Sequence, residues 1–264
     1  MLPYYPIPPL HLGPLTAYPF GFLVAVGIMV GISLAEKRCA IFGLKQEVLA
    51  GAVRWALICG FIGAHLYSAI FYFPEQVKEN PLYLLKFWDG ISSFGGFMGG
   101  SLGVVIYFYR TKQNFWAYGD CISYGFAFAW IFGRLGCTVA FDHPGNLTHF
   151  FLAMPYPVFA GAEVEPGIRH NLGFYEFLWA LCVSALFYSQ RLKTKFSGWY
   201  LTVFVVAYMP LRFFLDFMRA EDKRYFGLTA GQYGAVLLFA FGIWVWTTRA
   251  KVNQRLVPVR KQQY

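Results

Sequence analysis

The sequence predicts an all-α integral membrane protein with about seven transmembrane helices. Of its 264 residues, 58% are hydrophobic, 21% are aromatic and only 13% are charged, whereas about a quarter of the residues of a soluble domain are charged. An apolar helix of about 20 residues crosses the hydrocarbon core of a bilayer, so this length holds several spans and no separate soluble domain. The alternating segments of an outer-membrane β-barrel are not visible. We therefore expect a single polytopic membrane domain over residues 1–264.

Seven apolar segments are expected to form the spans. They cover residues of about 15–35, 48–73, 91–110, 118–141, 173–190, 198–218 and 229–248. Basic residues follow the first, third, fifth and seventh of them, namely Lys37, Arg38, Lys45, Arg110, Lys112, Arg191, Lys193, Lys195, Arg249, Lys251, Arg255, Arg260 and Lys261. Cytoplasmic loops carry an excess of Lys and Arg, so we expect the N-terminus outside and the C-terminus on the cytoplasmic side. Arg219, Lys223 and Arg224 follow the sixth segment on the opposite side, which we interpret as a functional hint.

The remaining composition argues against several other classes. A formal net charge of +9 does not indicate nucleic-acid binding, because the basic residues lie in short loops and at the C-terminus rather than in a stripe with exposed aromatics. The five cysteines, at positions 39, 59, 121, 137 and 182, show neither a disulfide framework nor a paired metal-ligand spacing. The histidines at 65, 143, 149 and 170 form no known ligand signature, so no metal and no cofactor are expected. The first residues lack the features of a removable signal peptide.

Residues 142–172 form the longest connection, between the fourth and fifth segments, and are expected outside the membrane. Loops longer than about 12–15 residues are often lids or binding loops, and a structureless surface loop is the alternative. Polar groups gather where this loop leaves the fourth segment. The stretch AWIFGRLGCTVAFDHPG contains Arg134, Cys137, Asp142 and His143.

Two arginines are expected to face each other across a cavity that opens to the outer leaflet. Arg134 lies at the end of the fourth segment, and Arg212 lies in the sixth with Asp216 and Arg219 on the same helical face. Guanidinium groups bind phosphate oxygens bidentately and stay charged, and the phospholipid head group is the most abundant phosphate at this depth. One alternative is that Arg134 alone reaches the head groups as an anchor. Another is that Arg212 and Asp216 form only an internal ion pair.

A glycine-rich region is a further candidate for substrate binding. It reads FWDGISSFGGFMGGSLG over residues 87–103. Its GxxxG spacing favours close helix packing. The alternative is a non-helical entry loop formed by Asp89, Ser92, Ser93 and the glycines, Gly95 and Gly96 among them, since irregular backbone at this depth has to line a cavity or be buried in protein.

The fifth segment opens with IRHNLGFYE and brings more polar groups to the same external side. Tyr175 is either part of the site or an interfacial belt residue. Glu176 lies about one turn inside the helix, where a carboxylate needs a partner. We expect that partner to be Arg134, Arg169 or Arg212.

The order of these motifs resembles that of the prolipoprotein diacylglyceryl transferase family. The resemblance rests on LGP near residue 12, NPLYLLKFWDGISSFGG, GRLGC, RHNLGFYE and YMPLRFFLDFMRAEDKRYFGLTAGQ, and it runs from about residue 11 to 248. It implies transfer of the diacylglyceryl group from phosphatidylglycerol to the lipobox cysteine thiol of an exported prolipoprotein, which releases glycerol phosphate. It also implies that Arg134 and Arg212 handle the phosphoglycerol head group.

The sequence departs from the family's motifs at several positions. Gly95 stands where the family's SFHGG motif has a histidine, Phe20 replaces a tyrosine, and His65 replaces an arginine. After GRLG, Cys137 replaces an asparagine. These departures leave open a paralogue that transfers a lipid-derived group to a different acceptor, and a non-catalytic lipid-binding membrane protein or transporter.

The residues after the fourth segment offer a replacement for the missing histidine. We predict that His143, oriented by Asp142, acts as a general base, and a solvated turn is the alternative. Cys137 is either a small buried hydrophobic residue or a covalent nucleophile activated by His143. The predicted catalytic residues are Arg134, Arg212, His143, Asp142 and Cys137, and the predicted substrate-binding residues are Asp89, Ser93, Gly95, Gly96, Tyr175, Glu176, Arg219 and His65.

Overall fold

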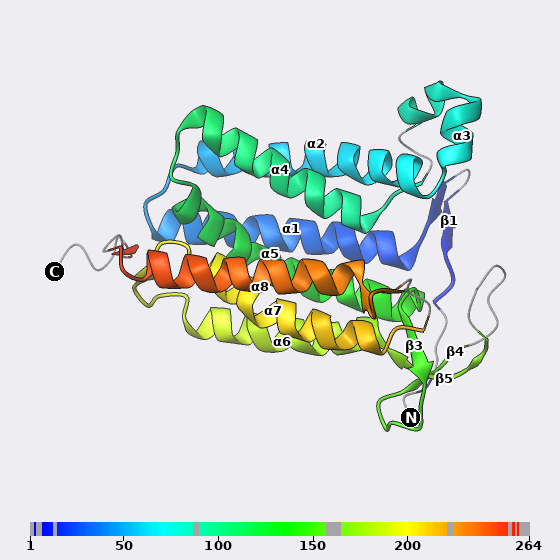
Figure 1. Ribbon diagram of the computed structural model, residues 1–264. Helices are drawn as coiled ribbons and strands as arrows, with labels where there is room; N and C mark the ends of the chain where they lie inside the picture. The colour runs from blue at the N-terminus through cyan, green and yellow to red at the C-terminus, as the bar shows by residue number, and fades with distance from the viewer. Residues whose placement is uncertain are drawn as a thin grey trace. The chain divides into compact units, whose positions relative to one another are not determined.

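Figure 1 shows a computed structural model of the chain, which describes residues 3, 7–12, 15–86, 90–156, 165–220, 224–252, 255, 256 and 258. The chain divides into two compact units. The larger unit contains residues 1–42 and 119–264, and the smaller unit contains residues 43–118. This division does not test the expectation of a single polytopic membrane domain, which stays a prediction.

Long helices form at all seven segments where the sequence predicts spans. They are α1 (Pro19–Ile41), α2 (Gln46–Phe71), α4 (Ser93–Thr111), α5 (Phe115–Ala140), α6 (Leu172–Ser189), α7 (Trp199–Phe217) and α8 (Ala230–Arg249). Within the described residues, 6 helices are long and apolar enough to cross a membrane, and α4 is not one of them because its glycines and serines lower its hydropathy. The chain is therefore a mainly helical, multi-pass membrane protein. The seventh span and the orientation of the termini stay predictions.

The smaller unit is built on close contact between α2 and α4. A Cβ atom at Gly99 would lie 2.2 Å from the carbonyl oxygen of Cys59, and one at Gly95 would lie 2.4 Å from that of Gly63. No side chain fits there, so the glycines let the two backbones approach. The packing interpretation of the GxxxG spacing is confirmed, and a non-helical loop is wrong for the glycines within α4. The unit also contains α3 (Pro74–Glu79) and the 3-10 helix η1 (Pro81–Leu85).

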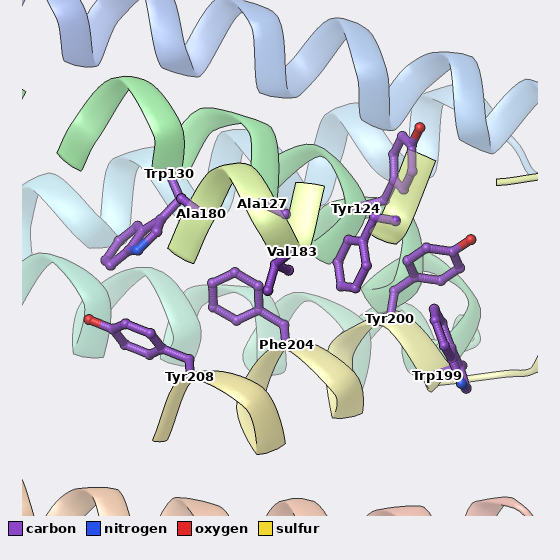
Figure 2. Close-up of a cluster of buried hydrophobic side chains, with 10 residues drawn as sticks. Tyr124, Ala127, Trp130, Ala180, Val183, Trp199, Tyr200, Phe204 and Tyr208 are labelled. Carbon is purple, nitrogen blue, oxygen red and sulfur yellow. The ribbon is translucent and has the colours of Figure 1, made fainter. Parts of the chain in front are cut away.

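An aromatic cluster between α5, α6 and α7 forms a core of the larger unit (Figure 2). Its buried members are Tyr124, Ala127, Trp130, Ala180, Val183, Phe187, Trp199, Tyr200, Phe204 and Tyr208. Many of the rings meet edge to face, as Trp130 and Tyr208 do at a centroid distance of 5.6 Å, which is an arrangement that aromatic quadrupoles favour. This packing fixes the three helices relative to one another.

Asp120 ties α5 to the start of α7. Its carboxylate is 1% exposed and accepts hydrogen bonds from the backbone nitrogens of Gly198 at 2.8 Å and Tyr200 at 2.7 Å. An acidic side chain at a helix N-terminus satisfies free N–H groups and interacts favourably with the helix dipole. The contact sets the register of α7 against α5 and so decides where Tyr208 and Arg212 stand.

Short strands pair at the helix ends, although the sequence predicts only helices. β1 (Leu10–Leu12) pairs with β2 (Leu15–Ala17), β6 (Lys195–Phe196) with β9 (Arg255–Leu256), and β7 (Arg224–Tyr225) with β8 (Leu228–Thr229). An antiparallel sheet of order β3-β5-β4 is formed by β3 (Pro144–Leu147), β5 (Gly167–Asn171) and β4 (Met154–Tyr156). It lies at the end of the larger unit where α5 ends and α6 begins (Figure 1). The alternative of a structureless loop is therefore wrong for the described part of residues 142–172.

Candidate active site

The carboxylate of Glu176 lies between two arginines from neighbouring helices. Its Oε2 is 2.8 Å from Nε of Arg134, and its Oε1 is 3.5 Å from Nη1 of Arg212. The three side chains come from α5, α6 and α7, and Glu176 is fully buried. Arg134 and Arg212 thus converge on one carboxylate, and each of them is a partner of Glu176. A cavity between the two arginines stays a prediction.

A second buried acid, Asp216, extends the ion pairs along α7. Its Oδ1 lies 2.9 Å from Nη2 of Arg212 and 3.2 Å from Nε of Arg219, because i+3 and i+4 spacings share one helical face. Thr229 donates a 2.8 Å hydrogen bond to Oδ2 of Asp216. Thr229 also forms a capping box with Gln232 at the start of α8. The ion pair that the sequence offers for Arg212 is therefore present as well.

The ion pairs of Arg134, Arg212, Arg219, Glu176 and Asp216 form one polar network, and its arginines and acids differ in exposure. The side chains of Arg212 and Arg219 are each 21% exposed, whereas those of Glu176 and Asp216 are 0% and 1% exposed. With Arg134, three guanidinium groups face two carboxylates, so these five side chains carry one net positive charge. An approaching anion therefore meets guanidinium groups before carboxylates.

Arg134 is less exposed than the other two arginines, at 10% of its side chain. Its Nη2 donates a 3.0 Å hydrogen bond to the Tyr208 hydroxyl, and its Nη1 lies 3.8 Å from Sγ of Cys137. The guanidinium carbon is 4.2 Å from the centroid of the Trp130 ring, within range of a cation–π interaction. Since protein groups hold Arg134 on every side, the interpretation as a lone head-group anchor is wrong.

Cys137, Asp142 and His143 meet at the end of α5. The sulfur, a carboxylate oxygen and a ring nitrogen lie within 4.8 Å of one another. Nδ1 of His143 hydrogen-bonds to Oδ1 of Asp142, so the expected pairing of these two residues is confirmed. Phe141 has a φ of 53°, a left-handed conformation that is rare for a bulky residue. This turn reverses the chain and brings Asp142 and His143 back beside Cys137.

The backbone of His143 is held by the neighbouring sheet. Its carbonyl oxygen accepts a 3.4 Å hydrogen bond from the Tyr156 hydroxyl and a 3.2 Å hydrogen bond from the backbone nitrogen of Leu172. Burial raises the pKa of Tyr156, so its hydroxyl stays protonated and able to donate. Two residues after His143, Gly145 forms a β-bridge with Arg219. The loop that carries His143 is thus joined to the segment that carries Arg219.

Other polar residues of the fifth segment make local contacts. Arg169, the third partner that the sequence offers for Glu176, instead donates to the carbonyl oxygens of Glu165 at 3.0 Å and Gly145 at 3.1 Å. The hydroxyl of Tyr175 lies 2.7 Å from Nδ1 of His170. Burial lowers the pKa of His170. The role of Tyr175 in substrate binding stays a prediction.

Three predicted substrate-binding residues, Ser93, Gly95 and Gly96, begin α4 in the smaller unit. A Cβ atom at Gly95 would lie 2.3 Å from Cβ of Tyr67, so a histidine does not fit at this position. If the two glycines of the family's SFHGG motif are matched to Gly95 and Gly96, Phe94 stands at the place of the histidine. The packing favours this match over the one that assigns the histidine's place to Gly95, and Phe94 is 55% exposed.

His65 also belongs to the smaller unit, where it is fully buried. Its two ring nitrogens lie 3.3 Å from the carbonyl oxygens of Gly90 and Tyr83. These contacts tie η1 and the turn before α4 to α2. Asp89 lies outside the described residues, and the substrate-binding roles of both residues stay predictions.

Sequence reasoning missed Tyr208 and Thr229. Tyr208 stands four residues before Arg212 in YMPLR, and this i,i+4 spacing is the signal that places both on one face of α7. Thr229 stands three residues before Gln232, which is the spacing of a capping box at a helix start. Neither pattern shows which acid the side chain meets.

A family model and two similar curated proteins agree on one family. Residues 9–248 match a family model described as prolipoprotein diacylglyceryl transferase. The chain is 28% identical over 239 residues to phosphatidylglycerol-prolipoprotein diacylglyceryl transferase 1 of Streptomyces coelicolor, which covers 89% of this chain and 69% of that protein. It is 27% identical over 217 residues to the phosphatidylglycerol-prolipoprotein diacylglyceryl transferase of Staphylococcus aureus strain MSSA476, which covers 80% of this chain and 77% of that protein.

Proposed function

The chain belongs to the prolipoprotein diacylglyceryl transferase family, and on that basis we propose that it transfers the diacylglyceryl group of phosphatidylglycerol to the lipobox cysteine of prolipoproteins. The family match and the names of the relatives support this function and do not favour another acceptor or a non-catalytic role. For the site, the observation that carries the proposal is the convergence of Arg134 and Arg212 on Glu176.

We place the reaction at the periplasmic side of a bacterial inner membrane. The polar network lies where α5 and α7 end and α6 and α8 begin. Basic residues gather at the other ends of the helices of the larger unit, at Arg38, Arg191, Lys195 and Arg249. Because an excess of basic residues marks the cytoplasmic side, the network faces the compartment that exported prolipoproteins enter.

Arg212 and Arg219 supply the most accessible donors for the phosphate of the head group. Guanidinium groups bind phosphate oxygens through two parallel hydrogen bonds. Glu176 and Asp216 hold them in place from the buried side without meeting the phosphate themselves. Arg134 adds positive charge from deeper in the network. These charges stabilise the negative charge that develops on the departing glycerol phosphate.

The transfer forms a carbon–sulfur bond and breaks a carbon–oxygen bond. The acceptor sulfur attacks the carbon of the diacylglyceryl group that carries the phosphate ester, and glycerol phosphate leaves with the electron pair of the broken carbon–oxygen bond. His143, oriented by Asp142, takes the proton of the acceptor thiol.

Cys137 lies beside the reacting groups, and both of its interpretations fit its surroundings. It is 7% exposed, as a small buried hydrophobic residue is, and its sulfur lies within 4.8 Å of a ring nitrogen of His143, the base that a nucleophile would need. Replacement by serine separates the two roles. A packing residue is expected to keep most of the turnover in Cys137→Ser, whereas loss of a thiol nucleophile reduces turnover by several orders of magnitude.

The experiment measures release of glycerol phosphate from labelled phosphatidylglycerol by the purified protein, together with the mass of a lipobox peptide. The wild-type protein is expected to release glycerol phosphate and to add one diacylglyceryl group to the peptide. Arg212→Ala is expected to lose both signals, and Arg191→Ala, at the other ends of the helices, is expected to keep both. Release without a gain in peptide mass overturns the prolipoprotein as acceptor, and no release overturns the transferase function.

A further inference from the structure

A sulfur, a ring nitrogen and a carboxylate oxygen meet at the end of α5. Among the described residues, Cys137, His143 and Asp142 offer ligand atoms that all lie within 4.8 Å of one another. Zn²⁺ takes sulfur, nitrogen and oxygen ligands together, whereas Mg²⁺ and Ca²⁺ take oxygen. We propose that these three side chains bind one divalent cation of the Zn²⁺ type.

The sequence predicts no metal because its spacing matches no known ligand signature. The structure shows how the three side chains come together without such a signature. Phe141 adopts a left-handed conformation and is 8% exposed. Its ring packs edge to face against Tyr156 at a centroid distance of 4.9 Å and belongs to a cluster with Met154. Strained backbone persists where the surroundings impose it, often at binding sites. Here its effect is to place Asp142 and His143 beside Cys137.

The charges of the site suit a divalent cation. A thiolate and a carboxylate carry two negative charges and a neutral imidazole adds none, so a divalent ion makes the group neutral. Nη1 of Arg134 lies 3.8 Å from Sγ of Cys137. The charge of Arg134 is itself paired with Glu176 at 2.8 Å. Three protein ligands leave the fourth position of a tetrahedral ion for water or a substrate group.

An ion at this site acts on the proposed reaction through His143. An imidazole nitrogen that binds a metal has no lone pair left for the proton of the acceptor thiol. Zn²⁺ is therefore expected to inhibit the transferase. This inhibition rests on the proposed role of His143 as a base, whereas binding of the ion does not.

Co²⁺ is the probe for the site, since it occupies zinc sites and a thiolate bound to it gives a charge-transfer absorption band. Metal-free, full-length protein in detergent is titrated with Co²⁺ and then with Zn²⁺. One equivalent of Co²⁺ is expected to produce the band, and Zn²⁺ is expected to remove it. Cys137→Ser is expected to abolish the band, and Asp142→Asn and His143→Gln to weaken binding by about tenfold or more.

Matched controls come from cysteine and histidine residues elsewhere in the larger unit. Cys182→Ser, at an exposed cysteine of α6, and His149→Gln, at an exposed histidine, are expected to keep the band and its stoichiometry. Thermal unfolding checks that each variant folds, and Cys137→Ala is used if the serine variant does not. The proposed metal site is overturned if Co²⁺ gives no charge-transfer band with the wild-type protein, or if the band persists when Cys137 is replaced. Glycerol phosphate release with and without Zn²⁺ is measured separately, and binding without inhibition keeps the site but overturns His143 as the base.

Discussion

The Tyr208 hydroxyl donates a 2.5 Å hydrogen bond to Oε2 of Glu176. The same oxygen lies 2.8 Å from Nε of Arg134 in an ion pair, and the other oxygen lies 3.5 Å from Nη1 of Arg212. A buried carboxylate is tolerated only when its charge is paired, and Glu176 is paired with Arg134 and Arg212 while its Oε2 accepts the hydrogen bond from Tyr208. Glu176 is therefore the group through which α5, α6 and α7 are joined at this end of the larger unit.

Replacement of Glu176 by glutamine is expected to destabilise the protein and to stop transfer. The amide removes the charge that compensates Arg134 and Arg212, and loss of one partner of a buried ion pair costs about 3–5 kcal/mol. Tyr208→Phe removes a hydroxyl but no charge, so we expect a smaller cost of about 1–3 kcal/mol. Thermal unfolding in one detergent and glycerol phosphate release measure the two effects. A larger loss of stability in Tyr208→Phe than in Glu176→Gln contradicts this ranking.

Replacement of Arg212 by lysine is expected to raise the KM for phosphatidylglycerol by about tenfold or more. Lysine keeps the charge but lacks the planar fork that binds two phosphate oxygens, and a hydrogen bond to a charged group contributes about 1.5–3 kcal/mol. Arg219→Lys is the matched change at an equally exposed arginine. Initial rates at varied phosphatidylglycerol content in mixed micelles give KM and kcat for both. If only kcat falls in Arg212→Lys, this residue does not bind the ground-state head group.

The long helices and the pairing of the charged groups within them are predictable because both follow from local rules. Apolar runs of sufficient length predict the long helices, and helical spacing places Arg212 and Asp216 on one face. A charged group within a span needs a partner. That requirement is enough to expect Glu176 to pair with Arg134, Arg169 or Arg212 before any contact is seen.

Contacts that depend on the tertiary fold are not predictable in this way. Tyr208 looks like one more aromatic residue of an apolar helix, since its role depends on α6 placing Glu176 next to it. The left-handed turn at Phe141 depends on packing against Tyr156, in a sheet that the apolar pattern does not indicate. That turn decides which groups lie beside Cys137, so the metal site is not visible in the spacing of its ligands.

Two neighbouring glycines of α4 are expected to respond differently to alanine. A Cβ atom at Gly95 would lie 2.4 Å from the carbonyl oxygen of Gly63, whereas one at Gly96 would lie 3.6 Å from the Cβ of Ala64. Gly95→Ala is expected to destabilise the protein by about 1–3 kcal/mol through overpacking. Gly96→Ala is expected to be neutral or to stabilise by up to about 1 kcal/mol, because alanine favours a helix. Thermal unfolding of both variants measures the difference, and equal losses contradict the close contact of α2 and α4.

His170 is expected to make the protein less stable as the pH falls. Burial lowers the pKa of His170 in the folded chain. When the pH drops through the ordinary histidine pKa, the unfolded chain binds a proton that the folded chain does not, so the free energy of unfolding decreases. The stabilising contribution is therefore present above the ordinary pKa and is lost on the acid side of it.

The matched test of this dependence compares two histidines. His170→Gln removes the titration and keeps a group that can hydrogen-bond to the hydroxyl of Tyr175, whereas His149→Gln replaces an exposed imidazole. The thermal unfolding temperature is measured between about pH 8 and about pH 5, which spans the histidine range. It is expected to fall less over this range in His170→Gln than in the wild type. His149→Gln is expected to follow the wild type. Parallel profiles for His170→Gln and the wild type would mean that burial of this imidazole does not contribute to acid sensitivity.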